Sequence, residues 1–278
     1  METNTPNNNP EDIDQPRLVV LLLLEGWGVA PDSEVNAIFQ ADTTNFLDLV
    51  KEYPVAVLDP GKEDINSRYL ELGNGLSDFI SKKELKQIKV ADSNRFAPAT
   101  YYFNNKQEGK LIGEEQIIIS ADQEAPHKEV IKETIKAIKS EEYQFILSSI
   151  SDIDDIAGKG DLEAVKKVIE AIDDSLKKIV SEVLAKKGVV LISASSGHAE
   201  KTKDLALDVV NKDITNSPVP LVIVGEEFKD SNIGLTDAPS NDLSALPVSG
   251  TLKDVVPTIL KAMKMDKPGE MMGKSFIE

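Results

Sequence analysis

The sequence predicts an α/β protein, a three-layer α/β/α sandwich with a mostly parallel central sheet. Short, continuously apolar segments alternate with longer segments in which apolar residues recur at helical spacing. Apolar runs without polar alternation are typical of parallel strands that helices cover on both faces. Neither an internal repeat nor a linker long enough to separate two domains interrupts this alternation. We therefore expect one domain over residues 16–278.

The expected strands are short, apolar and rich in β-branched residues. They cover 17–24, 54–59, 86–92, 114–120, 143–150, 188–193 and 219–225. Four of them contain a continuous apolar stretch, and we predict that these stretches are buried neighbours in one sheet. The four stretches are Leu18–Leu24, Ile146–Ser149, Val189–Ser193 and Leu221–Val224.

The expected helices carry their apolar residues on one face. They cover 36–53, 76–85, 127–140, 162–187 and 251–263. The longest begins after Asp161, a typical N-cap residue, and is expected to end at Gly188. The segment between Asp59 and Asn74 is predicted to be a loop.

The composition excludes several classes of function. The formal net charge of -17 disfavours binding to nucleic acid or to an anionic membrane surface. The chain has no cysteine, which excludes disulfides, thiolate nucleophiles and cysteine-ligated zinc. The longest apolar run, 18–24, is too short to span a bilayer, so we expect a cytoplasmic protein. Residues 1–15 are polar and rich in Pro and Asn, which predicts a disordered tail.

Six segments, in order along the chain, resemble one known family. They are 21–54 (beginning LLLLEGWG), 85–105, 158–180, 188–200 (GVVLISASSGHAE), 216–225 and 267–278. In these segments the chain resembles the cofactor-independent (2,3-bisphosphoglycerate-independent) phosphoglycerate mutases of the alkaline phosphatase superfamily. The resemblance implies an alkaline-phosphatase-like α/β/α core, which agrees with the fold predicted from the apolar pattern.

The resemblance also implies a metal-dependent chemistry. The family places a serine nucleophile between two divalent metal ions, usually manganese, which lower the pKa of the nucleophile and neutralise phosphoryl charge. Glu25 replaces the family's first-strand aspartate, and Asp154 keeps the aspartate of its Asp-x-x-Gly-His-Thr segment. Glu25 and Asp154 are therefore candidate residual metal ligands. The alternative interpretation is that they are solvated or hydrogen-bonded loop carboxylates.

The family's ligand histidines are missing from the matching positions. Gly158 stands in place of one, and the third falls near Ile214. In the remaining segment Ser195 and Ser196 replace an aspartate and a histidine, and His198 falls on an asparagine. We expect the serines to cap the next helix, with a nucleophile in a rearranged site as the alternative. His127 is expected to be exposed near a helix start, and Trp27 to pack rather than to stack on a ligand.

The nucleophile motif and the substrate domain of the family have no counterpart. No Gly-Asn-Ser-Glu sequence follows the second strand. The loop expected after Asp59, of about 14 residues, is too short for the inserted domain that grips phosphoglycerate. Arg95 replaces a family lysine that faces the phosphate, and is the one candidate substrate-binding residue.

Two functions are compatible with these residues. The first, which we favour, is a non-catalytic binding or regulatory protein with an unidentified protein partner, no assigned catalytic residue and no expected cofactor. If any ion binds, we expect a weakly held divalent cation, magnesium or manganese. The second is a divergent metal-dependent phosphatase or phosphoglycerate mutase. It would use Glu25, Asp154 and further ligands such as Asp152, Asp155 or His198.

Overall fold

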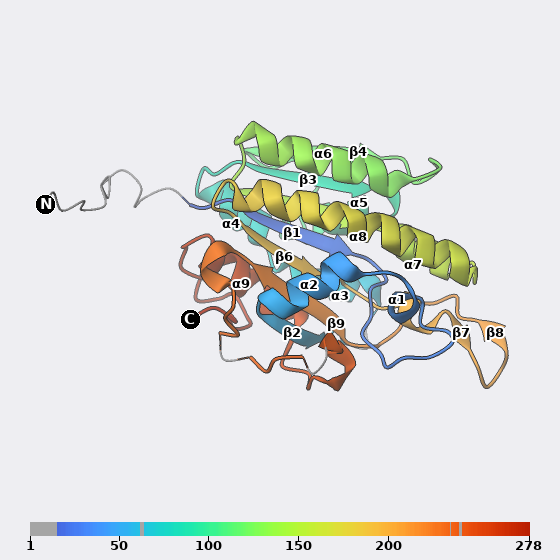
Figure 1. Ribbon diagram of the computed structural model, residues 1–278. Coiled ribbons are helices and arrows are strands. Elements are labelled where there is room, and N and C mark those ends of the chain that lie inside the picture. The colour runs from blue at the N-terminus through green and yellow to red at the C-terminus, as the bar shows by residue number, and fades with distance from the viewer. Residues whose placement is uncertain (1–15, 62–63, 234, 239–240) are drawn as a thin grey trace, which may run out of the picture.

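The computed structural model describes residues 16–61, 64–233, 235–238 and 241–278 (Figure 1). The tail predicted over residues 1–15 lies outside this range. The fold is a central β-sheet between helices, as the apolar pattern predicts. A separate two-stranded hairpin, β7 (Lys203–Asp204) with β8 (Val209–Val210), projects from one end of the molecule (Figure 1).

The central sheet joins eight strands in the order β10-β2-β9-β6-β1-β5-β3-β4 among the described residues. The strands are β1 (Val19–Leu24), β2 (Val55–Asp59), β3 (Gln87–Asp92), β4 (Glu114–Ile119), β5 (Phe145–Ile150), β6 (Val189–Ser193), β9 (Val219–Val224) and β10 (Gly250–Thr251). β9 runs antiparallel to β2 and β6, whereas the other pairs are parallel. The prediction of a mostly parallel sheet is confirmed.

The four strands predicted as buried neighbours do lie side by side, in the order β9-β6-β1-β5. Val19 of β1 is in register with Phe145 of β5 on one side and with Val189 of β6 on the other. Each residue of β1 is at most 1% exposed. This continuous burial explains why the central strands have no polar alternation.

Two groups of helices accompany the sheet. The helices are α1 (Ala37–Gln40), α2 (Thr44–Glu52), α3 (Ile65–Gly73), α4 (Leu76–Lys82), α5 (Ser93–Tyr101), α6 (Pro126–Ser140), α7 (Asp152–Ala157), α8 (Leu162–Leu184) and α9 (Val255–Ala262). In Figure 1, α6, α8 and α2 lie in front of the sheet, and α8 packs against both of the others. α3 contacts α5 and α9 in the second group.

The helix expected over 36–53 is divided in two. α1 ends at Gln40, and the next residue, Ala41, has an extended backbone. Asp42 Oδ1 then accepts hydrogen bonds from the backbone N and the hydroxyl of Thr44, at 3.2 and 2.6 Å. Short polar side chains that bond to nearby backbone compete with a continuous helix, which explains the break.

The prediction of a loop between Asp59 and Asn74 is wrong for most of this segment, because helix α3 occupies Ile65–Gly73. Asp64 accepts hydrogen bonds from Asn66 N and Ser67 N and so caps helix α3. Apolar residues of this helix recur at helical spacing along one face. Tyr69, on this face, is completely buried. The helix brings Tyr69 to the carboxyl edge of the sheet.

The end of the long helix α8 also differs from its prediction. Asp161 caps its start, as expected, by accepting a hydrogen bond from Ala164 N at 3.0 Å. The residue with a left-handed backbone after the helix is Lys187, not Gly188. Gly188 is needed for close packing instead, because a Cβ atom there would lie 2.7 Å from Val183 Cγ1.

Candidate functional site

Six side chains meet at the carboxyl edge of the sheet, and we call them the Glu25–Asp154 cluster. They are Glu25, Tyr69, Arg95, Asp154, Ser195 and His198. Each follows a strand of the central sheet, and in a mostly parallel sheet such positions meet at one edge. The predicted candidates Glu25, Asp154 and Arg95 are thus brought together.

The backbone around Gly26 holds the two carboxylates close to each other. Asp154 N donates to the carbonyl of Glu25 at 3.2 Å, and His198 N donates to that of Gly26 at 3.1 Å. Gly26 has a φ of +92°, and a Cβ atom there would lie 2.9 Å from Asp154 N. Only glycine fits this crossing without strain.

Neutral donors surround the carboxylate of Glu25, which is completely buried. Tyr69 donates its hydroxyl to Oε1 at 2.8 Å. Oε2 accepts from the Ser195 hydroxyl and also from Ser195 N, at 3.3 Å. Burial raises the pKa of Glu25, although the charge of Arg95 and the two hydroxyl donors partly oppose this shift. The sequence predicts that Ser195 caps the next helix. This prediction is wrong, because the Ser195 hydroxyl donates to Glu25 instead.

Two basic side chains share the carboxylate of Asp154. Arg95 Nη2 forms an ion pair with Oδ2, and His198 Nδ1 lies 2.5 Å from Oδ1. Burial lowers the pKa of Arg95, but the charges of Asp154 and Glu25 outweigh it, so the pKa is raised and the guanidinium stays charged. Arg95 thus faces protein carboxylates in this structure.

His198 has the geometry of a charged imidazolium. Its Nε2 lies 2.9 Å from the carbonyl of Asn211, while Nδ1 faces Asp154. A neutral imidazole has only one N–H, whereas both nitrogens here face acceptors. Burial lowers the pKa of His198, but the hydrogen bonds to Asp154 and Asn211 raise it on balance.

The cluster therefore contains its own positive charge. Arg95 and His198 supply two cations beside two carboxylic groups, and all carboxyl oxygens of Glu25 and Asp154 have donors. Within the described chain, no group of three or more His, Cys, Asp or Glu side chains is arranged to hold a metal ion. The donor set does not fit the metal centre that the family resemblance implies. Metal binding by Glu25 and Asp154 stays a prediction.

The imidazole of His198 lies beside Gly158, the position at which the family resemblance implies a ligand histidine. A Cβ atom at Gly158 would lie 3.4 Å from His198 Cε1. Ser196, at a second lost histidine position, is buried, and its hydroxyl has no hydrogen-bond partner among the described residues. His198, from the segment after β6, thus lies beside the Gly158 position while its Nδ1 contacts Asp154.

His127 and Asp152 form a second His–Asp pair, which lies outside the cluster. The prediction that His127 is exposed is wrong. His127 is only 4% exposed, and its Nδ1 lies 2.5 Å from Asp152 Oδ2. The other polar atoms of this pair, His127 Nε2 and Asp152 Oδ1, are buried without a partner in the described chain.

Asp155 accepts hydrogen bonds from Ser151 Oγ at 2.6 Å and from Asn94 Nδ2 at 2.7 Å. Asp152 and Asp155 therefore make contacts of their own rather than bonding to Glu25 or Asp154.

Tyr69 is the one cluster residue that no motif predicted. The signal for it was local: Asp64 is a good N-cap, and Ile65, Tyr69 and Leu72 follow at helical spacing. The resemblance had drawn attention to a missing nucleophile motif in this interval rather than to its helical pattern.

The comparisons with known proteins define the class. The sequence model of the Metalloenzyme superfamily matches residues 17–267, and the chain belongs to that superfamily. It is also similar to named 2,3-bisphosphoglycerate-independent phosphoglycerate mutases. The match to the mutase of Acetivibrio thermocellus has 33% identity over 214 residues, and that of Clostridium botulinum 30% over 215. Each match covers 74% of this chain but only 39% of the mutase.

Solved structures support the fold. The Leishmania mexicana phosphoglycerate mutase has a TM-score of 0.56 at 22% identity, covering 71% of this chain and 38% of that one. Alkaline phosphatase from the Antarctic bacterium TAB5 has a TM-score of 0.61 at 12% identity, covering 91% and 100%. The predicted alkaline-phosphatase-like core is thereby confirmed.

Only five residues separate β2 from α3, so no substrate domain is inserted there. No helix in the described part of the chain is long and apolar enough to cross a membrane.

Proposed function

We propose that this chain is a non-catalytic binding or regulatory protein built on a metalloenzyme core. Its own basic side chains take the place of metal ions at the carboxyl edge of the sheet. The observation that carries this proposal is the ion-paired state of Asp154, which faces Arg95 on one side and His198 on the other.

Electrostatics supports the proposal. A divalent cation at Asp154 would come close to a guanidinium and an imidazolium, and like charges in a buried site repel strongly. An imidazolium has no free lone pair with which to ligate a metal. Arg95 and His198 would therefore have to move away before an ion could bind.

Burial argues in the same direction for Ser195. Its hydroxyl donates to a carboxylate, which is a geometry that can activate a nucleophile. However, both Ser195 and Glu25 are completely buried. A phosphoryl group has no access to this hydroxyl without opening of the cluster.

A divergent metal-dependent phosphatase or phosphoglycerate mutase is the second candidate. Membership in the superfamily favours it, as does the unpartnered Nε2 of His127 at the same edge. Asp152 orients this imidazole through Nδ1, as carboxylates orient metal-ligating histidines in many enzymes.

An activity assay distinguishes the two candidates. Purified protein is incubated with manganese, magnesium, zinc or cobalt, and both p-nitrophenyl phosphate hydrolysis and phosphoglycerate interconversion are measured. The proposal predicts no turnover above that of the Asp154→Asn and His127→Gln variants. Metal-dependent turnover that either substitution abolishes would establish the enzyme instead.

A further inference from the structure

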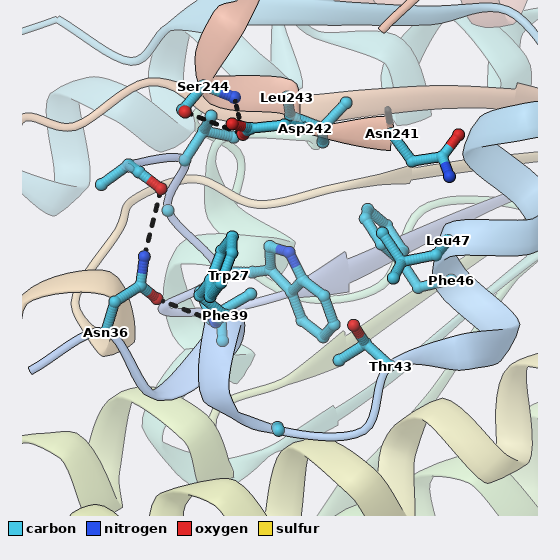
Figure 2. Close-up of a pocket in the computed structure, with 15 residues that line it drawn as sticks. Trp27, Asn36, Phe39, Thr43, Phe46, Leu47, Asn241, Asp242, Leu243 and Ser244 are labelled. Atoms are coloured by element: carbon cyan, nitrogen blue, oxygen red, sulfur yellow. Dashed lines mark hydrogen bonds between the residues drawn. The ribbon is translucent and has the colours of Figure 1, made fainter. Parts of the chain in front are cut away.

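A cavity of about 410 Å³ lies next to the loop that follows β1. Residues from this loop, from α1 and α2, and from the short helix Leu243–Ala245 line it (Figure 2). Cavities that bind small organic molecules have volumes of about 300–1,000 Å³. The size of this cavity suits such a ligand.

Aromatic rings form much of the cavity wall. Trp27 and Phe46 pack against each other with ring centroids 4.7 Å apart, and both are almost fully buried. Phe39 also lines the cavity but is 51% exposed (Figure 2). Two rings are thus fixed by core packing, while the third can contact a ligand from the solvent side.

The charge of the lining selects against anions. Asp242 is the one ionisable side chain among the lining residues of the described cavity, and no Lys, Arg or His lines it. Ser244 fixes the carboxylate, because its N and Oγ both donate to Oδ1, at 2.9 and 2.7 Å. In the described structure no hydrogen bond reaches Oδ2 of Asp242. The net charge of -17 adds a long-range attraction for cations.

We propose that this cavity binds a small organic cation, an ammonium compound with an aromatic or branched alkyl body. The apolar body would fill the space beside Trp27 and Leu243, and the ammonium group would lie near Asp242. Aromatic faces attract cations as well as apolar groups, so the same walls suit both parts of the ligand. This site is separate from the Glu25–Asp154 cluster, and its ligand class goes beyond the proposed function.

The chain supplies its own reporter, because Trp27 is its single tryptophan. Three probes of nearly equal shape differ in charge: phenethylamine is cationic, phenethyl alcohol neutral and phenylacetate anionic. Each is titrated into the full chain while tryptophan emission is recorded, and calorimetry gives an independent binding curve. We expect saturable binding that is tightest for the amine, weaker for the alcohol and absent for the carboxylate.

Two matched variants test the role of the charge. Asp242→Asn should weaken binding of the amine about fivefold, as expected for a partly exposed ion pair, and leave the alcohol unchanged. Asp230→Asn removes an equal charge at an exposed residue that does not line this cavity, and should change neither affinity. This control separates the local carboxylate from the general attraction of an acidic chain.

Several results would overturn the proposal. These are equal affinities for the three probes, no saturable binding by either method, or equal effects of Asp242→Asn and Asp230→Asn on the amine. None of them bears on the ion pairs of Asp154, so the proposed function and this inference fail independently.

Discussion

The loop that follows β1 borders two regions of opposite character. Glu25, at its start, belongs to a buried cluster in which each carboxyl oxygen has a donor within the protein. Trp27, two residues later, lines an open cavity whose walls are mainly apolar (Figure 2). The cluster is closed by its own charges, whereas the cavity has room for another molecule. The family resemblance points to the cluster, whereas the space that could hold a ligand lies next to it.

The largest expected effect is the loss of Arg95. Arg95→Met should lower the free energy of unfolding by about 3–5 kcal/mol, because it leaves Asp154 buried with only His198 to balance it. Urea unfolding measures the change. The double variant Arg95→Met/Asp154→Asn should recover part of the loss. If the single variant is as stable as wild type, the cluster is not held by this ion pair.

A smaller loss is expected for Tyr69→Phe, which removes one donor from Glu25. The cost should be about 1–3 kcal/mol, because a buried oxygen of Glu25 loses its hydrogen-bond donor. Tyr143→Phe is the matched control, since Tyr143 bonds to the exposed Glu115 and should lose much less. Equal losses in the two variants would mean that Glu25 gains nothing special from Tyr69.

The Lys89–Glu114 pair shows how a buried ion pair behaves away from the cluster. Its nitrogen and oxygen lie 3.0 Å apart, and both side chains are fully buried. Burial lowers the pKa of Lys89 to about 8, although Glu114 opposes this shift. Between this pKa and that of an unfolded lysine, near 10.4, the unfolded state binds more protons, so rising pH stabilises the fold through this group.

The expected slope is at most about 1.4 kcal/mol per pH unit between pH 8 and pH 9.5. The free energy of unfolding is measured by urea unfolding at each pH for wild type and for the Lys89→Met/Glu114→Gln variant. The slope is that of the difference between the two proteins. A slope of zero or of opposite sign would show that the pKa of Lys89 is not depressed. The cluster could then not be contrasted with an ordinary buried pair.

The smallest effect is expected at the rim of the cavity. Phe39→Ala should cost less than about 1 kcal/mol, because the ring is half exposed. Phe46→Ala, on the buried side of the same cavity, should cost about 3–5 kcal/mol. Thermal unfolding of the pair tests whether the cavity has one rigid wall and one that is dispensable for folding. Similar losses would indicate that Phe39 is part of the core.

Much of the fold was predictable, because burial on both faces imposes a pattern that a sequence shows directly. The four central strands and the cap at Asp161 follow from local rules. The candidate site was predictable only in its location. Glu25, Asp154 and Arg95 each follow a predicted strand, and in the structure they lie at one edge of the sheet.

What the sequence did not show is how the residues at this edge pair with one another. Tyr69 reaches Glu25 because a short helix forms where a loop was expected. His198 pairs with Asp154 across 44 residues, and His127 is buried by its contact with Asp152. Such pairings depend on the relative positions of distant segments, which no local pattern encodes.

In the proposed function, Arg95 and His198 take the place of metal ions beside Asp154. Calorimetric titration of manganese or zinc into chelator-treated wild type and Asp154→Asn shows whether these side chains exclude a metal ion. We expect no saturable site in wild type that is missing from the variant, because Arg95 and His198 already balance the carboxylate of Asp154. One or two stoichiometric sites in wild type that disappear in Asp154→Asn would contradict it.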